Sequence, residues 1–203
     1  MADISLHTTY FGPIQWYQLL YRSESVIINE YERWQKQTIR NRCLIATANG
    51  VQTLSVPIVH SHKRPEQTRD ICISNHGKWR REHWNALQSA YGESPFFDYY
   101  VDDLRPFFEN QWESLFDFNL AIIYKVCELL DIHPNIQVAD SDTQDVLNHP
   151  VFSNSHPTDN NFPKEVQGQT PYYQVYQQKF GFLPNLSILD LLFNMGNEAI
   201  FYL

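Results

Sequence analysis

The chain has 203 residues, of which 43% are hydrophobic and 15% aromatic, and its formal net charge is -8. This length allows one domain with a sizeable core, or two small ones. The acidic balance excludes a general nucleic-acid-binding protein, because such proteins need a broad basic surface.

The sequence shows no targeting or membrane signal. The first residues lack the basic start and the apolar run of a signal peptide, and no apolar segment reaches the length of a membrane span. Three cysteines, Cys43, Cys72 and Cys127, are odd in number, and no Cys-x-x-Cys pair is present. The sequence therefore indicates neither a disulfide framework nor a cysteine zinc site, and we expect buried, reduced thiols in a cytoplasmic protein.

The N-terminal residues predict a parallel βαβ unit. Residues 4–9 are typical of a short strand, residues 14–21 have apolar side chains at helical spacing, and residues 26–28 form a β-branched run. A strand, a helix and a strand within so few residues favour parallel pairing. The loop after the first strand holds His7 and Tyr10, and such loops at the carboxyl ends of strands commonly bind ligands.

A basic stretch follows at residues 33–42, with four positive charges and no acid. As a strand, it would present one face made of Lys36, Thr38, Arg40 and Arg42. Gln35, Gln37 and Asn41 would then lie on the other face. As a helix, it would still bring Lys36 next to Arg40. Both interpretations bring cationic donors together, as a phosphate or carboxylate requires. The alternative is a solvated edge whose charges keep other chains from pairing.

The next segment predicts a hairpin and then helices. Asn49-Gly50 is a strong turn signal, residues 53–59 are typical of the returning strand, and the loop after it holds His60, His62 and Lys63. Residues 70–74 predict another short strand.

Three helical segments come next. Residues 78–91 predict a helix that carries His83 and Tyr91, and residues 96–108 predict two helical pieces broken before Pro106. Residues 114–130 are the clearest amphipathic helix.

The last third of the chain changes in character. Residues 133–170, rich in Pro, Asn and Asp, predict a long loop. Ser187 is a natural N-cap for a final helix, with Asp190 three residues later as a near capping box. Asn185 lies just before this helix, where free N–H groups favour an anion; the alternative is that the segment is only a cap.

Histidines and carboxylates supply further candidates. His7 and His83 are candidates for proton transfer, although a histidine beside Trp84 on an aromatic helix face is also typical of a hydrogen-bonded core residue. His60 and His62 alternate, but the sequence supplies no third ligand at a decisive spacing, so we predict no metal site. The dispersed acidic residues between 98 and 117 fit a solvated face better than an acid–base pair.

Several blocks carry a resemblance to a known family. The blocks are residues 10–13 (Tyr-Phe-Gly-Pro), 35–43, 54–59, 83–84, 87–91, 94–97 and 184–194. With these blocks the chain resembles the WbqC-like proteins over nearly its whole length outside residues 133–170. The resemblance implies a bacterial protein of surface-polysaccharide (O-antigen) biosynthesis, and an activity as a glycine or other amino-acid transferase. It brings no catalytic residue set.

The chain also departs from longer relatives. Many of them begin with His-Gln-Pro, where this chain has His7-Thr8-Thr9, and they have a fuller central segment with a glycine-rich turn that residues 133–170 do not match. If that segment holds the substrate in the relatives, the departure implies a different substrate for this chain. The N-terminal pattern is also similar to that of nucleotidyl-transferring α/β enzymes, but His-x-x-His and GxxxxGK[ST] are absent.

We therefore expect a single α/β domain over residues 1–203, with a mixed β-sheet flanked by helices, a βαβ start and a C-terminal helix. The expected function is a transferase with a small anionic substrate, such as a nucleotide or nucleotide sugar, and no nucleic-acid partner. The alternative is a non-catalytic binding or scaffold protein of the same pathway, which uses its aromatic surface for a protein partner. The candidate catalytic residues are His7 and His83. The candidate substrate-binding residues are Tyr10, Gln35, Lys36, Thr38, Arg40, Asn41, Arg42, His60, Lys63, Tyr91 and Asn185.

Overall fold

The structure, a computed structural model, describes residues 4–59, 67–139 and 168–203. Three short strands form a parallel sheet in the order β1-β2-β5: β1 (Ile4–Leu6), β2 (Val26–Ile28) and β5 (Ile136–Val138). Helix α1 (Ile14–Arg22) connects β1 to β2, so the predicted βαβ unit is confirmed. The prediction of a loop from residue 133 was wrong at its start, because β5 pairs with β2 there. A three-residue strand is too short to show a pattern in the sequence.

The other two strands form a hairpin. Strands β3 (Arg42–Thr47) and β4 (Gly50–Ser55) pair antiparallel, with Thr47 opposite Gly50. Gly50 has a φ of +106°, which a residue with a side chain rarely adopts. The hairpin is confirmed, but its second strand begins and ends earlier than the predicted 53–59. The α/β class is confirmed as well, with the strands divided between two small sheets.

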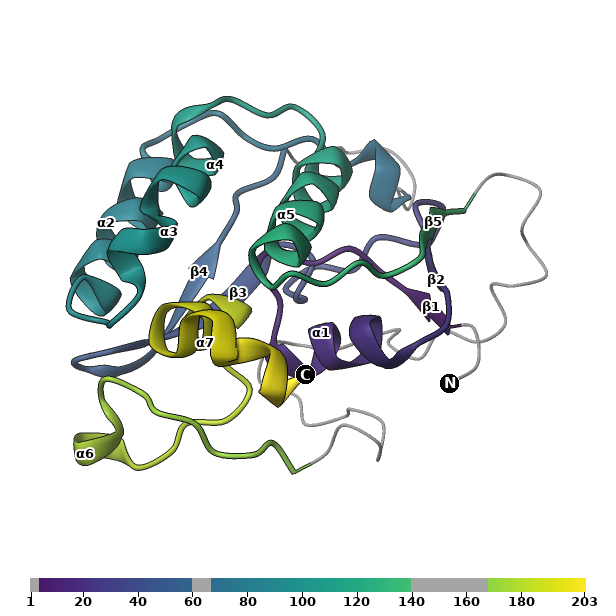
Figure 1. Ribbon diagram of the computed structural model, residues 1–203. Helices are drawn as coiled ribbons and strands as arrows, with labels where there is room; N and C mark the ends of the chain where they lie inside the picture. Colours follow the sequence, from purple (N-terminus) through teal and green to yellow (C-terminus); the bar gives the residue numbers. More distant parts are fainter. Residues whose placement is uncertain (1–3, 60–66, 140–167) are drawn as a thin grey trace.

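Five helical segments follow the hairpin: η1 (Thr68–Asp70), α2 (Trp79–Tyr91), α3 (Phe97–Leu104), α4 (Pro106–Glu109) and α5 (Leu115–Leu129). The predicted break before Pro106 is confirmed, and Ser114 caps α5 by accepting from the backbone N–H of Asp117. The strand predicted at 70–74 was wrong: Cys72 and Ile73 make only isolated bridges, to Ser114 and Ile58. Figure 1 shows α2, α3 and α4 together on one side of the hairpin, with α5 between them and the parallel strands.

The C-terminal part contains α6 (Gln177–Phe180), α7 (Ile188–Met195) and the 3-10 helix η4 (Gly196–Tyr202). Residues 188–194 of α7 are all buried, because this helix lies centrally and contacts α1, α3, β3 and η4 (Figure 1). The predicted N-cap is confirmed, since Ser187 Oγ accepts from the N–H of Leu189 at 3.2 Å. The same hydroxyl donates to the carbonyl of Phe11 at 2.7 Å and so connects α7 to the first loop.

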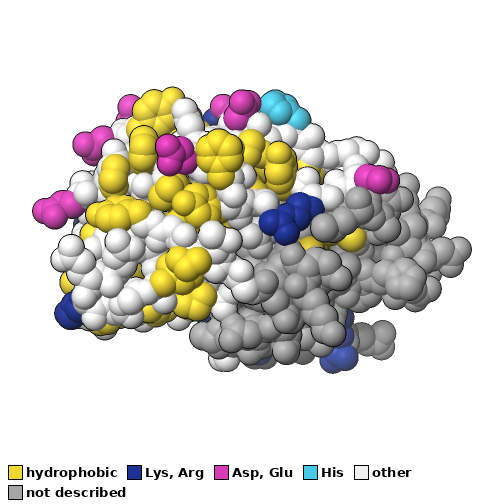
Figure 2. All heavy atoms as spheres, turned by 60° about the horizontal axis from the view of Figure 1, so that its bottom comes forward, with side chains coloured by type: hydrophobic (Ala, Val, Ile, Leu, Met, Phe, Trp, Pro, Cys, Tyr) yellow, Lys and Arg dark blue, Asp and Glu magenta, His cyan; other side chains and the backbone are white. Residues whose placement is uncertain are grey.

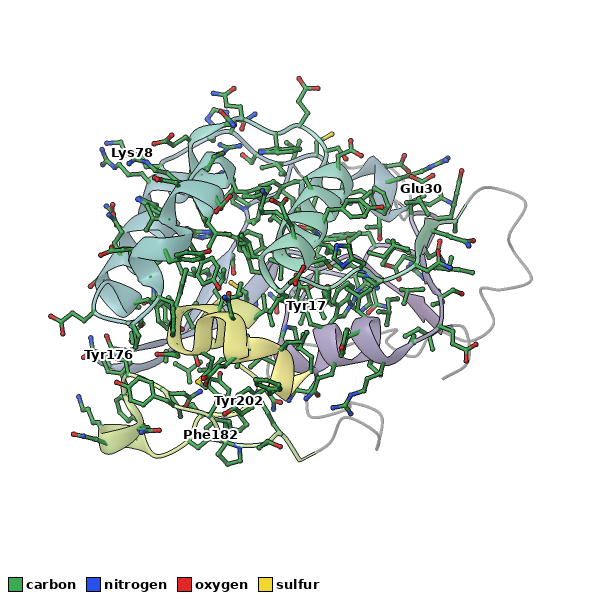
Figure 3. All side chains as sticks on the ribbon, viewed as in Figure 1. Tyr17, Glu30, Lys78, Tyr176, Phe182 and Tyr202 are labelled. Carbon is green, nitrogen blue, oxygen red and sulfur yellow. The ribbon has the colours of Figure 1, made fainter. Side chains whose placement is uncertain are left out.

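One continuous cluster of buried apolar side chains extends from Leu6 to Leu203. Tyr17 of α1 points toward α5 (Figure 3), where it lies near Cys127, and burial raises the pKa of its hydroxyl well above 10. Phe182 and Tyr202 lie below α7 in the view of Figure 3. Tyr172 packs edge-on against both of them. Each large side chain buried in such a core contributes about 1.5–3 kcal/mol to stability.

Asp190 is a buried carboxylate at the centre of a polar network. It is the near capping-box residue of the sequence, but its oxygens accept from the hydroxyls of Tyr91 (2.9 Å) and Tyr172 (2.5 Å) and from Gln174 Nε2 (3.0 Å). Burial raises the pKa of Asp190 from 3.8 to about 6, although these three donors oppose the shift. The network joins α2, α7 and residues 172–174.

Within the described parts of the chain, no helix has both the length and the apolar composition to cross a membrane. The cysteines Cys43, Cys72 and Cys127 are all unbridged. Cys43 and Cys127 are buried as expected, whereas Cys72 is exposed.

Candidate functional site

The loop after β1 anchors the basic stretch. The backbone N–H of Tyr10 donates to the carbonyl of Ile39 at 2.9 Å, and Thr9 Oγ1 donates to the same carbonyl at 3.0 Å. Thr9, Tyr10 and Ile39 are all buried. The two segments that the sequence singled out therefore lie side by side.

The basic stretch is neither the strand nor the helix that the sequence allowed. Residues 36–41 form successive turns, Gln37 has a φ of +63°, and β3 begins only at Arg42. A turn does not keep alternate side chains on one face, so the cationic groups diverge. The expectation that Lys36, Arg40 and Arg42 line one pocket was therefore wrong for Arg40.

Arg40 points into the protein and is 0% exposed. Its Nε donates to Glu32 Oε1 at 2.7 Å and its Nη2 donates to Glu32 Oε2 at 2.6 Å, which is a bidentate ion pair. Its Nη1 donates to Thr38 Oγ1 at 3.2 Å, and its backbone carbonyl accepts from Asn119 Nδ2 at 2.7 Å. A guanidinium taken out of water needs such a partner, and Glu32 supplies it. The Arg40 side chain is therefore buried in this ion pair and does not line the surface.

Lys36 and Arg42 do share a pocket, which we call the basic pocket. It has a volume of about 260 Å³ and is lined by Trp34, Lys36, Gln37, Asn41, Arg42, Ser55, Val56, Pro57 and Ile58. One wall is made by the turn of the basic stretch and the other by the end of β4. Neither Lys36 nor Arg42 makes an ion pair with any carboxylate in the parts of the chain that the structure describes.

Three buried polar atoms of the residues around the basic pocket have no hydrogen-bond partner among the described residues. They are Trp34 Nε1 and Arg42 Nε, which are donors, and Asn41 Oδ1, which is an acceptor. Each of these atoms is closed off from solvent, so none of them is open to a ligand in the pocket as it stands. The pocket is the candidate binding site because Lys36 and Arg42 bring two cationic side chains to it with no carboxylate partner among the described residues.

His83 lies behind the wall of the basic pocket. Its Nδ1 and the hydroxyl of Tyr10 share a hydrogen bond of 2.8 Å, and the ring also makes a hydrogen bond with the backbone of Ser55, a pocket residue. Burial lowers the pKa of His83 from 6.5 to about 4, so the ring is neutral at physiological pH. The arrangement supports the end of β4, and it keeps the ring away from the pocket surface.

His7 is also buried. Its Nδ1 lies 3.2 Å from the carbonyl of Thr8, and the carbonyl of His7 accepts from Trp16 Nε1 at 3.2 Å. Burial first, and then the nearby Arg40 guanidinium, lower the pKa of His7 well below 6.5. The catalytic roles of His7 and His83 stay predictions.

The other predicted residues are dispersed. Thr38 Oγ1 donates to the carbonyl of Gln35 at 3.3 Å, so both stabilise the turn. Tyr91 belongs to the Asp190 network, where its hydroxyl also accepts from the N–H of Ala46 at 3.0 Å. His60 and Lys63 lie outside the described residues, as does His62.

Asn185 does not line the basic pocket, although it lines a small void together with Arg42. It has a φ of +62°, its side-chain oxygen accepts from Gln15 Nε2, and its N–H donates to Gln169 Oε1 at 3.0 Å. A void of about 10 Å³, the size of one water molecule, lies between Asn185 and Arg42. Arg42 is therefore the residue that connects the basic pocket to the start of α7.

The sequence did not identify Trp34, Ser55 or Glu32. Trp34 belongs to the basic stretch. Its indole could have indicated a residue that stacks on a ring or donates an N–H in a binding site. Glu32 lies eight residues before Arg40, and no sequence periodicity connects them. In the parts of the chain that the structure describes, no group of three His, Cys, Asp or Glu residues is arranged to hold a metal ion.

Comparisons with known proteins agree with the blocks that carry the resemblance. The model of the WbqC-like protein family matches residues 8–149 and 144–202. The uncharacterized protein Rv1507c of Mycobacterium tuberculosis is 28% identical over 211 residues, which cover 93% of this chain and 91% of that protein. No solved structure matches the chain. Because the family model covers most of its length, the chain belongs to the WbqC-like protein family.

Proposed function

We propose that the protein binds a small anionic molecule in the basic pocket and acts as a cytoplasmic, single-domain transferase of bacterial surface-polysaccharide (O-antigen) biosynthesis. The observation that carries the proposal is the pair of cationic side chains, Lys36 and Arg42, which line one cavity and have no carboxylate partner among the described residues. The ammonium of Lys36 and the guanidinium of Arg42 both donate hydrogen bonds and carry positive charge. An anion satisfies the donors and balances the charge at the same time.

The electrostatics of the whole chain support this proposal. The protein has a net charge of -8, so its surface repels anions in general. Lys36 and Arg42 form a local exception, since no described carboxylate pairs with either of them. We expect the attraction to weaken as salt is added, because Lys36 is exposed.

The transferase part of the proposal rests on the family. WbqC-like relatives suggest transfer of glycine or another amino acid to a sugar, and a nucleotide- or carrier-linked donor would supply the anionic group. The Tyr10–His83–Ser55 chain of hydrogen bonds holds one wall of the basic pocket in place.

A second candidate function, a binding or scaffold protein, has its own support. Tyr99 of α3 and Phe201 of η4 are 70% and 83% exposed, and both elements contact α7. On the face shown in Figure 2, hydrophobic and acidic side chains are frequent among the described residues, and Lys and Arg are few. Exposed apolar side chains that gather on one face are typical of protein interfaces.

The test is a binding screen by thermal shift and calorimetry with phosphate, nucleotides, nucleotide sugars and amino acids. We expect at least one of these anions to stabilise the wild type, and Arg42→Ala to lose about tenfold or more in affinity, since a charged hydrogen bond contributes about 1.5–3 kcal/mol. The matched control is Arg81→Ala, which removes an exposed arginine of α2 outside the basic pocket. Equal affinities in the Arg42 and Arg81 variants would refute the site.

A cell experiment separates the two candidate functions. A strain that lacks the gene is supplied with the Arg42→Ala chain or with a Tyr99→Ser, Phe201→Ser chain, and its surface polysaccharide is measured. The transferase proposal expects loss of polysaccharide with the first chain only. Loss with the second chain only would favour the scaffold function.

A further inference from the structure

We propose that a cavity at the C-terminal end of α5 is a second binding site, and that it takes a small organic cation: an amine or ammonium group attached to an apolar or aromatic body. The cavity, which we call the amine pocket, is lined by residues of the last two turns of α5 and of the segment 131–136, where the chain continues to β5 (Figure 1). None of these residues lines the basic pocket, so the inference goes beyond the proposed function and does not depend on it.

The backbone at the end of α5 brings a carboxylate to this cavity. The helix ends in a Schellman turn, in which the N–H of Asp131 donates to the carbonyl of Glu128 at 3.1 Å and the N–H of Ile132 donates to the carbonyl of Cys127 at 3.0 Å. Asp131 has a φ of +54°, and glycine is the usual residue at this position of the turn. The turn buries Ile132 and leaves Asp131 exposed at the amine pocket.

The charges around the amine pocket favour a cation. The C-terminal end of a helix dipole is negative and is stabilised by basic side chains, but the last turn of α5 contains none. Glu128 and Asp131 add two carboxylates there, and no Lys or Arg lines the pocket. Lys125 Nζ lies 2.8 Å from Glu128 Oε2 and 3.5 Å from Asp103 Oδ1, so Glu128 is partly neutralised. Asp131 makes no ion pair with any described residue, and a bound cation would supply one.

The remaining lining favours an organic cation over a metal ion. The volume is about 430 Å³, within the range of about 300–1,000 Å³ that is typical of small-molecule sites. Cys127 and Ile132 are buried and supply apolar surface to the cavity, and the ring of Tyr124, which is 49% exposed, is available for a cation–π contact. Among the described residues, no three His, Cys, Asp or Glu are arranged to hold a metal ion.

The expected selectivity follows from the exposure of the charged and aromatic groups. Asp131 and Tyr124 are both exposed, so solvent screens their interactions with a ligand. An exposed ion pair and an exposed cation–π contact each change an affinity by about two- to fivefold. We therefore expect a cation to bind about fivefold more tightly than a neutral molecule of the same shape.

The experiment uses the full chain and two pairs of ligands that match in shape and differ in charge: benzylamine against benzyl alcohol, and choline against 3,3-dimethyl-1-butanol. Affinities are measured by NMR titration of isoleucine methyl groups. We expect at least one cation to bind about fivefold more tightly than its neutral match, and to shift the methyl groups of Ile132 and Ile136 but not those of Ile58, which lines the basic pocket.

Two variants test the role of the carboxylate. Asp131→Asn keeps the size of the side chain and tolerates the left-handed backbone, and it should reduce the preference for the cation at least twofold. The matched control is Asp102→Asn, which removes an exposed carboxylate of α3 outside the amine pocket and should keep the preference of the wild type.

Three results would overturn the inference. They are equal affinities, or no binding, for the charged and neutral members of both pairs; methyl shifts that do not include Ile132 or Ile136; and equal preferences in the Asp131 and Asp102 variants. The comparison in the wild type is decisive even if Asp131→Asn does not fold. None of these results bears on anion binding in the basic pocket, which the Arg42→Ala variant tests separately.

Discussion

Replacing Arg40 with alanine removes a buried cation and leaves the carboxylate of Glu32 without its bidentate partner. Removing one member of a buried ion pair costs about 3–5 kcal/mol of unfolding free energy. The Glu32 side chain is 18% exposed, so water compensates part of the loss and places the expected cost near 3 kcal/mol, at the lower end of that range.

This cost is large enough to measure by two methods. For a chain of this size, 1 kcal/mol corresponds to roughly 2–4 °C in melting temperature, so Arg40→Ala should melt about 6–12 °C below the wild type. Urea titrations followed by circular dichroism give the free energy directly. The control is Arg42→Ala, which removes a cation that has no ion pair with any described carboxylate and should change stability by less than about 1 kcal/mol.

A double substitution tests the physical reason. Arg40→Met combined with Glu32→Leu replaces the pair by apolar side chains, and such replacements are often neutral or stabilising. We therefore expect the double variant to recover much of the stability that Arg40→Ala loses. The reasoning is refuted if Arg40→Ala melts like the wild type and yet loses the ligand, because Arg40 would then act in the basic pocket.

Three further predictions concern buried groups near the site. Asp190 has a pKa raised from 3.8 to about 6, so its contribution to stability is fully present below pH 3.8 and is lost as the pH rises through 6. Relative to Asp190→Asn, the wild type should gain about 2 kcal/mol from pH 7 to pH 4 in urea titrations, and a constant difference would contradict this. His83 has a pKa lowered to about 4, so its contribution to the free energy of unfolding is present above pH 6.5 and is lost as the pH falls through 4. The stability of the wild type relative to His83→Gln should therefore fall by about 3 kcal/mol from pH 7 to pH 4 in urea titrations. A rise in this difference would contradict the assignment of a neutral ring. A Cβ at Gly12 would lie 2.2 Å from Thr9 Oγ1, so Gly12→Ala should lower the free energy of unfolding by about 1–3 kcal/mol, measured in thermal melts. Gly77→Ala is the control for backbone strain alone, because a Cβ there meets open space while the φ is +80°.

The elements that the sequence predicted well are those determined by local chemistry. The βαβ start, the hairpin at Asn49-Gly50, the helix break before Pro106 and the cap at Ser187 all follow from interactions within a few residues. Turn residues, proline and capping hydroxyls act on their immediate neighbours, so their effect is visible in the chain itself.

The elements that the sequence missed depend on distant partners. Strand β5 exists because residues 136–138 pair with β2, more than 100 residues earlier. The capping-box interpretation of Asp190 was incomplete, because the hydroxyls of Tyr91 and Tyr172 donate hydrogen bonds to its oxygens. A short strand or a single carboxylate has too little local preference to specify such a role.

The basic stretch shows the same division within ten residues. Its composition alone indicated a place for an anion in an acidic protein, and Lys36, Asn41 and Arg42 do line one pocket. Only the tertiary structure shows that Arg40 pairs with Glu32 instead of lining the pocket, and that Trp34 lines the pocket. The physical reason is that a charge or a polar atom takes its role from what surrounds it after folding, since burial sets the cost of leaving it unpaired.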